Sequence, residues 1–263
     1  MLRVLFIGDI VGRPGRKAIR SGLREMIDAT GVDLIVANGE NAAGGFGITR
    51  EVTQELLNGG VDVITMGNHT WDNRDIYNVL ENEPRVIRPA NYPKGTPGQG
   101  FYLAETEKGV LVAVTNLLGQ VFLEPTRCPF ETADEVIQSL KKRTDIILVD
   151  IHAEATSEKI ALGWYLDGRV TAVIGTHTHI ATADERILPK GTGYITDVGM
   201  TGPLNSVLGI DPEIVITKFR TKRPVRFEVA EGPVMLNSVL LDIDEFGKTT
   251  AIQRIRRDFE AIG

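Results

Sequence analysis

The chain has 263 residues, of which 42% are hydrophobic and 24% charged, and its formal net charge is −6. This balance is typical of a globular protein with one core, and we expect a single domain over residues 1–263. The acidic charge argues against indiscriminate binding to nucleic-acid backbones, and the single Cys128 excludes an internal disulfide. No apolar run approaches the length of a membrane span or a signal-peptide core, so we expect a cytoplasmic protein with no membrane partner.

The first part of the chain alternates between apolar runs and amphipathic stretches. Three apolar runs predict buried strands, at residues 2–7, 32–37 and 61–66. Pro14 is predicted to open the first helix, because proline is favoured at the first helical position. Thr49 is expected to cap a second helix, and a third helix is predicted to begin near Asn73.

The later part of the chain first continues this pattern and then changes to short strands. Two further strands are predicted to end at His152 and His177, with helices before and between them, one of them capped by Thr132. Short apolar runs beyond His179 favour an antiparallel layer, at residues 186–188, 194–196, 225–229 and 234–243. Strand–helix alternation followed by clustered strands is typical of two sheets flanked by helices, an α/β architecture.

Polar residues that can bind metals follow these strands. The chain contains four histidines, and each lies at or just beyond the end of a predicted strand, namely His69, His152, His177 and His179. The other candidates have carboxylate or amide side chains and stand in the same positions, namely Asp9, Glu40, Asn41 and Asn68. Because parallel strands place ligands at their carboxyl ends, we expect these groups to converge.

Each candidate has a structural alternative when it is taken alone. Asp9 would suit a helix cap, Glu40 and Asn41 would suit a turn, and a histidine at a strand end is often a hydrogen-bonded structural residue. Joint placement at five strand ends favours a metal site over these alternatives. Imidazole, carboxylate and amide ligands suit Fe, Mn or Zn better than Mg or Ca, and seven ligands fit two ions.

The motifs resemble those of the calcineurin-like metallophosphoesterases. Their signature is D-x-H, G-D-x-x-D, G-N-H-[D/E], a histidine and G-H-x-H, and the matching residues are Asp9, Glu40-Asn41, Gly67-Asn68-His69, His152 and His177-Thr178-His179. Three departures stand out: Val11 replaces the first histidine, Glu40 replaces the bridging aspartate, and Thr70 replaces the acidic residue. With these departures the whole chain resembles the bacterial YmdB family of 2′,3′-cyclic-nucleotide 2′-phosphodiesterases.

This resemblance implies an α/β fold, the calcineurin-like metallophosphoesterase sandwich of two mixed sheets flanked by helices. It also implies two divalent or mixed-valence transition-metal ions per chain, with iron favoured over manganese and zinc. One ion would be held by Asp9, Glu40, Asn41 and His179. The other would be held by Glu40, Asn68, His152 and His177.

The implied reaction is hydrolysis of a small phosphodiester, in which a metal-bridging hydroxide attacks phosphorus and His69 acts as general acid. Expected partners are a nucleotide substrate, RNA ends and further copies of the chain in a homo-oligomer. Two alternatives stay open: a phosphomonoesterase on the same site, and a metal-dependent RNA-binding or regulatory protein with incidental hydrolysis.

Secondary features concern the rim of the site. Loops at residues 44–47 and 88–100 are rich in glycine or proline, and we expect both to border the metal cleft. The basic stretch 218–226 would guide RNA or form a solvated surface. Three aromatic residues would stack a base at the rim or pack in the core, namely Trp71, Tyr92 and Phe122.

Overall fold

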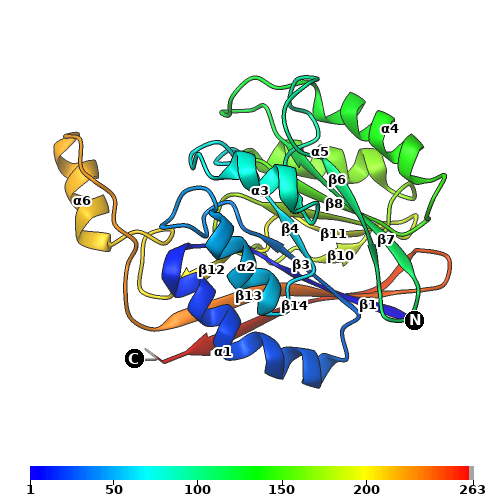
Figure 1. The fold of residues 1–263 in the computed structure, drawn as a ribbon, viewed down its shortest axis with the longest axis horizontal. Coiled ribbons are helices and arrows are strands. Elements are labelled where there is room, and N and C mark those ends of the chain that lie inside the picture. The colour runs from blue at the N-terminus through cyan, green and yellow to red at the C-terminus, as the bar shows by residue number, and fades with distance from the viewer. Residues whose placement is uncertain (261–263) are drawn as a thin grey trace.

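The computed structural model describes residues 1–260 and arranges their strands in two mixed sheets that pack face to face (Figure 1). The larger sheet has the order β2 (Asp9–Ile10), β12 (Met200–Pro203), β13 (Val234–Ile243), β1 (Leu2–Ile7), β3 (Leu34–Asn38), β4 (Val63–Thr65) and β5 (Val86–Ile87), and β14 (Thr249–Phe259) pairs with β13. The smaller sheet has the order β10 (Arg186–Ile187), β11 (Gly193–Ile195), β9 (Ala172–Thr176), β8 (Ile147–His152), β7 (Leu111–Leu118) and β6 (Phe101–Glu105).

Helices cover the outer faces of both sheets. The larger sheet packs against α1 (Gly12–Thr30), α2 (Arg50–Asn58) and α3 (Ile76–Asn82). The smaller sheet packs against α4 (Pro129–Leu140) and α5 (Thr156–Leu166). The remaining described helix, α6 (Pro212–Thr221), projects from the body of the molecule (Figure 1). The expected α/β sandwich of two mixed sheets flanked by helices is therefore confirmed.

Strand β1 contributes side chains to two hydrophobic cores, one on each face of the larger sheet. Alternate side chains of a strand point to opposite faces, so Leu5 and Ile7 join the core under the helices, whereas Val4 and Phe6 join the core between the sheets. All four side chains have 0% exposure. A strand buried on both faces reads as a continuous apolar run, which is the pattern of residues 2–7.

Parallel pairing brings several strand ends to the same place. In the larger sheet β1, β3 and β4 are parallel neighbours, and in the smaller sheet β7, β8 and β9 are parallel neighbours. Asn38, Thr65, His152 and Thr176 are the last residues of β3, β4, β8 and β9. The polar residues that follow or end these strands consequently meet at one end of the sandwich.

The helix caps and the later strands agree only in part with the sequence-based expectations. The Thr49 cap is confirmed, because its side chain accepts a hydrogen bond from the Val52 amide. The Thr132 cap is wrong: the N-cap of α4 is Cys128, four residues earlier, and Pro129 supplies a φ suited to the first helical position. The strand at 225–229 is also wrong, because Val229 forms only an isolated bridge with Ile210. The expected antiparallel layer is only partly present, since β11 pairs with β9 in parallel.

Across residues 1–260, none of the helices combines the length and apolar character that crossing a membrane requires.

Candidate metal centre

Asp9 lies just beyond β1 and is completely buried. Its Oδ2 accepts a hydrogen bond of 3.2 Å from the His177 amide, and its Oδ1 is buried without a hydrogen-bond partner among the described residues. Burial raises the pKa of the Asp9 carboxyl. The nearest cationic group to Oδ1 is His152, whose Nδ1 lies 3.9 Å away, beyond hydrogen-bond distance. A buried carboxylate oxygen without a hydrogen bond is costly, and a bound cation would offset this cost.

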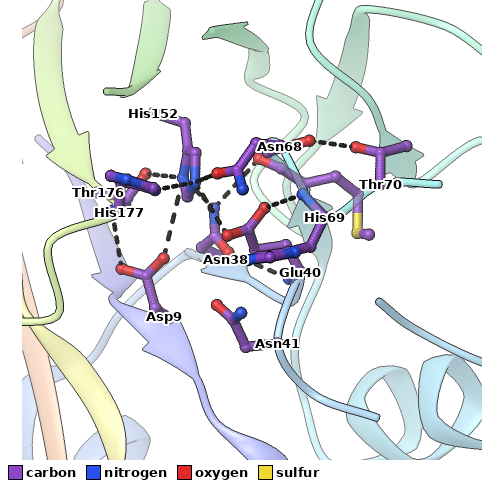
Figure 2. A network of polar contacts seen from close by, with 12 residues as sticks. Asp9, Asn38, Glu40, Asn41, Asn68, His69, Thr70, His152, Thr176 and His177 are labelled. Carbon is purple, nitrogen blue, oxygen red and sulfur yellow. Dashed lines mark hydrogen bonds and ion pairs between the residues drawn. The ribbon is translucent and has the colours of Figure 1, made fainter. Parts of the chain in front are cut away.

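Glu40 follows β3 and lies at the centre of the cluster (Figure 2). Its Oε1 lies 2.9 Å from His152 Nε2, and its Oε2 accepts a 2.9 Å hydrogen bond from the His69 amide. Burial raises the pKa of this carboxyl, but the charge of His152 and the hydrogen bonds from His152 and the His69 amide outweigh burial and bring the pKa to about 2. Glu40 is therefore an ionised group placed between several strand ends.

His152, His177 and Asn68 bring three further donor atoms together beside Glu40. His152 Nε2 lies 3.0 Å from Asn68 Oδ1 and 3.0 Å from His177 Nδ1. One donor atom from each of Glu40, His152 and His177 can be chosen so that all lie within 4.8 Å of one another. Burial and the charge of His152 lower the pKa of His177 to about 3, so His177 is neutral, the form that binds metals.

Hydrogen bonds behind His152 fix which nitrogen faces the cluster. Thr176 Oγ1 donates to Asp150 Oδ1 at 2.7 Å, so its oxygen is left to accept from His152 Nδ1 at 2.9 Å. This arrangement assigns a proton to Nδ1 and directs Nε2 at the cluster. Burial opposes protonation of His152, but Glu40, Asp9 and Asp150 raise its pKa to about 9, so a bound metal would displace the proton on Nε2.

His179 and Asn41 form the other side of the cluster. His179 Nε2 lies 3.3 Å from Asn41 Oδ1, and His179 Nδ1 donates to the Leu208 carbonyl at 3.0 Å. The Asn41 amide donates to the Gly45 carbonyl at 3.0 Å, which leaves Oδ1 directed at His179. The structure therefore brings together Glu40, Asn68, His152 and His177 on one side and Asn41 with His179 on the other, with Asp9 beside them.

His69 differs from the other three histidines in its position. Its side chain is 27% exposed, and its Nδ1 lies 2.7 Å from Asp72 Oδ2, so the ring lies outside the group of donor atoms. The edge of the Phe46 ring packs against it at a centroid distance of 5.0 Å. Asp72 was not identified from the sequence, since it lies in an irregular turn with no periodic pattern to mark it.

A buried ion pair supports the turn that carries His177 and His179. Both histidines have positive φ, 102° and 64°, which is strained for residues other than glycine. Between them, Thr178 donates from its amide (3.0 Å) and its hydroxyl (2.8 Å) to Asp197 Oδ2. Asp197 is held in turn by Lys159 at 2.7 Å, and both side chains of the pair are fully buried. The sequence did not identify Lys159, because lysine is rarely buried.

Gly67 shows how closely the donors pack. A Cβ at this position would lie 2.5 Å from His152 Nε2 and closer still to Glu40 Oε2. Glycine is thus required because the backbone passes directly against two donor side chains.

A cavity of about 550 Å³ opens onto the cluster and is lined by Glu40, Asn41, His69, His177 and His179 among others. Gly45 and Phe46 also line it, so the expected position of the 44–47 loop is confirmed. Residues 88–100 do not line this cavity among the described residues, but Tyr92 Oη donates to the Gly67 carbonyl at 3.5 Å, so this loop contacts the turn that carries Asn68 and His69. The three aromatic residues proposed for base stacking, Trp71, Tyr92 and Phe122, do not line the cavity. Trp71 packs against Tyr92, and Phe122 is 87% exposed.

Comparison with known proteins gives consistent matches over nearly the whole chain. A sequence model described as YmdB-like protein matches residues 5–255. The chain is 51% identical to the 2′,3′-cyclic-nucleotide 2′-phosphodiesterase of Bacillus subtilis (strain 168), over 97% of this chain and 96% of that protein. A hypothetical protein from Thermus thermophilus superposes with a TM-score of 0.92 at 43% identity, covering 98% of this chain and 100% of that one. A novel phosphatase from Mycoplasma pneumoniae gives a TM-score of 0.92 at 38% identity, covering 98% and 94%.

Proposed function

Since the chain belongs to the YmdB-like protein family, we propose that it is a metal-dependent phosphodiesterase that opens 2′,3′-cyclic nucleotides at the 2′ oxygen. The observation that carries this proposal is the convergence of carboxylate, amide and imidazole groups from both sheets beside one cavity. The activity named for the Bacillus subtilis relative, at 51% identity, supports the same substrate class.

The residues present fit two cations. We assign Asp9, Glu40, Asn41 and His179 to one ion, and Glu40, Asn68, His152 and His177 to the other, with iron favoured over manganese and zinc. The orphaned Asp9 Oδ1 and the donor atoms gathered around Glu40 support this assignment. Two such ions would stabilise the negative charge that builds up on the phosphoryl oxygens during hydrolysis.

The protein's own groups would then orient the substrate and supply a proton. His69 Nδ1 lies 2.7 Å from Asp72 Oδ2, so Nε2 is the ring nitrogen left to contact a substrate in the cavity. In the proposed reaction His69 Nε2 donates its proton to the departing ribose 2′ oxygen. The packing of Phe46 against the ring restricts its rotation and keeps it at the cavity wall.

The test of this function is turnover of 2′,3′-cyclic AMP by protein loaded with manganese, with bis-p-nitrophenyl phosphate and p-nitrophenyl phosphate as comparison substrates. We expect the product to be 3′-AMP, identified by phosphorus NMR, and we expect the diesters to be hydrolysed faster than the monoester. Removal of metal with EDTA should abolish turnover, and added manganese should restore it.

Two other outcomes would replace this proposal. Faster hydrolysis of p-nitrophenyl phosphate than of either diester would identify a phosphomonoesterase. Binding of the cyclic nucleotide without turnover would identify a regulatory or RNA-binding protein. Action on RNA ends and assembly into a homo-oligomer stay predictions, which oligonucleotides ending in a 2′,3′-cyclic phosphate and light scattering would test.

A further inference from the structure

The segment at residues 205–230, which contains α6, carries apolar side chains without burying them. Val215 is the one buried residue within α6. Phe219 is 67% exposed, Leu208 45% and Val207 36%. Exposed large apolar groups that gather in one place mark a binding surface more often than single ones do.

These side chains line the same cavity as the proposed metal ligands. We call them the apolar wall, which consists of Val207, Leu208, Ile210, Val215, Phe219 and Phe227. The cavity therefore has an acidic and imidazole-rich end on the strand ends and an apolar, partly aromatic end on the projecting segment. Its volume of about 550 Å³ lies in the range of small-molecule sites.

Specific contacts hold the apolar wall in place beside the cluster. Lys218 Nζ lies 4.3 Å from the centroid of the Phe227 ring, a cation–π contact that joins α6 to the returning chain. The Leu208 carbonyl accepts the hydrogen bond from His179 Nδ1 at 3.0 Å. The wall is thus tied directly to one of the proposed metal ligands.

The geometry points to the apolar wall as the binding site for the nucleobase of the substrate, with Phe219 as the residue on which the base stacks. A cyclic nucleotide has a phosphate at one end and a flat base with two π faces at the other, and an apolar, partly aromatic wall suits those faces. Aromatic side chains accept any base, because every base has a π face. This inference rests on the proposed function and extends it from the phosphate to the rest of the substrate.

The test compares two substrates that differ only in the base, 2′,3′-cyclic AMP and ribose 2′,3′-cyclic phosphate. In Phe219→Ala, KM for 2′,3′-cyclic AMP should rise by about fivefold or more because the stacking contact is lost. Hydrolysis of the ribose compound should change by less than about twofold, since it has no base to stack. Ile216→Ala is the matched control, because Ile216 is 44% exposed on the same helix and does not line the cavity.

The results separate this inference from the function on which it rests. If the wild-type protein hydrolyses neither compound, the proposed function is wrong. If it hydrolyses both and Phe219→Ala leaves KM for 2′,3′-cyclic AMP unchanged or impairs both substrates equally, the base site is wrong. Light scattering adds one more contradicting outcome: an equal loss on both substrates together with a change in molecular mass would show that the wall covers another copy of the chain.

Discussion

The ligand cluster and the apolar wall face the same cavity but are built in opposite ways. The cluster side chains Asp9, Glu40 and His152 are at most 1% exposed and lie on, or just beyond, strands of two packed sheets. The wall lies on a projecting segment where Phe219 is 67% exposed (Figure 1). Under the proposed function the reaction chemistry would lie in the buried core, whereas recognition of the base would lie on an exposed segment whose side chains can be replaced without loss of core packing.

The energetic consequences of substitution differ accordingly. Loss of one charged group in the cluster leaves other buried charges without partners, which lowers the free energy of unfolding. Loss of an exposed side chain in the wall removes one contact with the substrate and leaves the core intact.

The largest effect is expected for Glu40→Gln. Glu40 is assigned to both ions, so loss of its charge should release both metals and reduce turnover by at least about 10⁴-fold. Elemental analysis and kinetics on 2′,3′-cyclic AMP measure the two effects. Glu245→Gln, an exposed carboxylate in a turn, is the control. Two tightly bound ions at full activity in Glu40→Gln would remove Glu40 from the bridging position.

His69→Gln should have a large effect that depends on the leaving group. Without the proton donor, turnover of 2′,3′-cyclic AMP should fall by about 10²–10⁴-fold while both metals are retained. With bis-p-nitrophenyl phosphate the loss should be much smaller, because p-nitrophenolate departs without a proton. Asp72→Asn keeps the imidazole but weakens the contact that orients it. Turnover of 2′,3′-cyclic AMP should therefore fall by less than in His69→Gln, and again by more than turnover of bis-p-nitrophenyl phosphate. Loss of metal from His69→Gln would instead place His69 among the ligands.

Asp197→Asn should lower the metal affinity of the centre, although Asp197 is not one of the proposed ligands. The change leaves Lys159 buried without its counter-charge, so the free energy of unfolding should fall by about 3–5 kcal/mol. The turn between His177 and His179 also loses its anchor, and metal affinity should fall by about 10–100-fold. Denaturant unfolding and metal titration measure these quantities, with the exposed Asp145→Asn as control. Unchanged metal affinity in a destabilised variant would show that the pair serves folding alone.

The smallest effect tests whether the two regions are independent. Among the described residues, no hydrogen bond or ion pair joins Asp197 to Phe219, so the double variant Asp197→Asn/Phe219→Ala should lose kcat/KM as the product of the single losses, within about twofold. The measurement is kcat/KM for 2′,3′-cyclic AMP at one metal concentration that does not saturate Asp197→Asn, so that its weaker metal binding lowers turnover. A double variant no worse than either single variant would mean that the cluster and the wall act as one unit.

The parts of the site that could be predicted from sequence are those tied to buried strands. His152 and His177 stand at the ends of continuous apolar runs, and such runs predict both a strand and the place where its end must lie. Glu40, Asn41 and Asn68 follow strands in the same way. This regularity also explains why the two-sheet architecture was predicted correctly.

The parts that could not be predicted depend on contacts between distant segments. Lys159 would be placed at the surface by its residue type, and only the fold shows its buried partner Asp197. Residues 225–229 have the composition of a strand. Among the described residues their only β-type pairing is the isolated bridge between Val229 and Ile210, so no strand forms. The start of α6 did carry a local signal, Asp211 before Pro212, and Asp211 does accept hydrogen bonds from the Glu213 and Ile214 amides.

The most direct test of the central claim is anomalous diffraction from crystals of the wild-type protein loaded with manganese. The account predicts two anomalous peaks per chain, one beside Asp9, Asn41 and His179 and the other beside Asn68, His152 and His177, with Glu40 between them. A single peak, or two peaks away from Glu40, would contradict it.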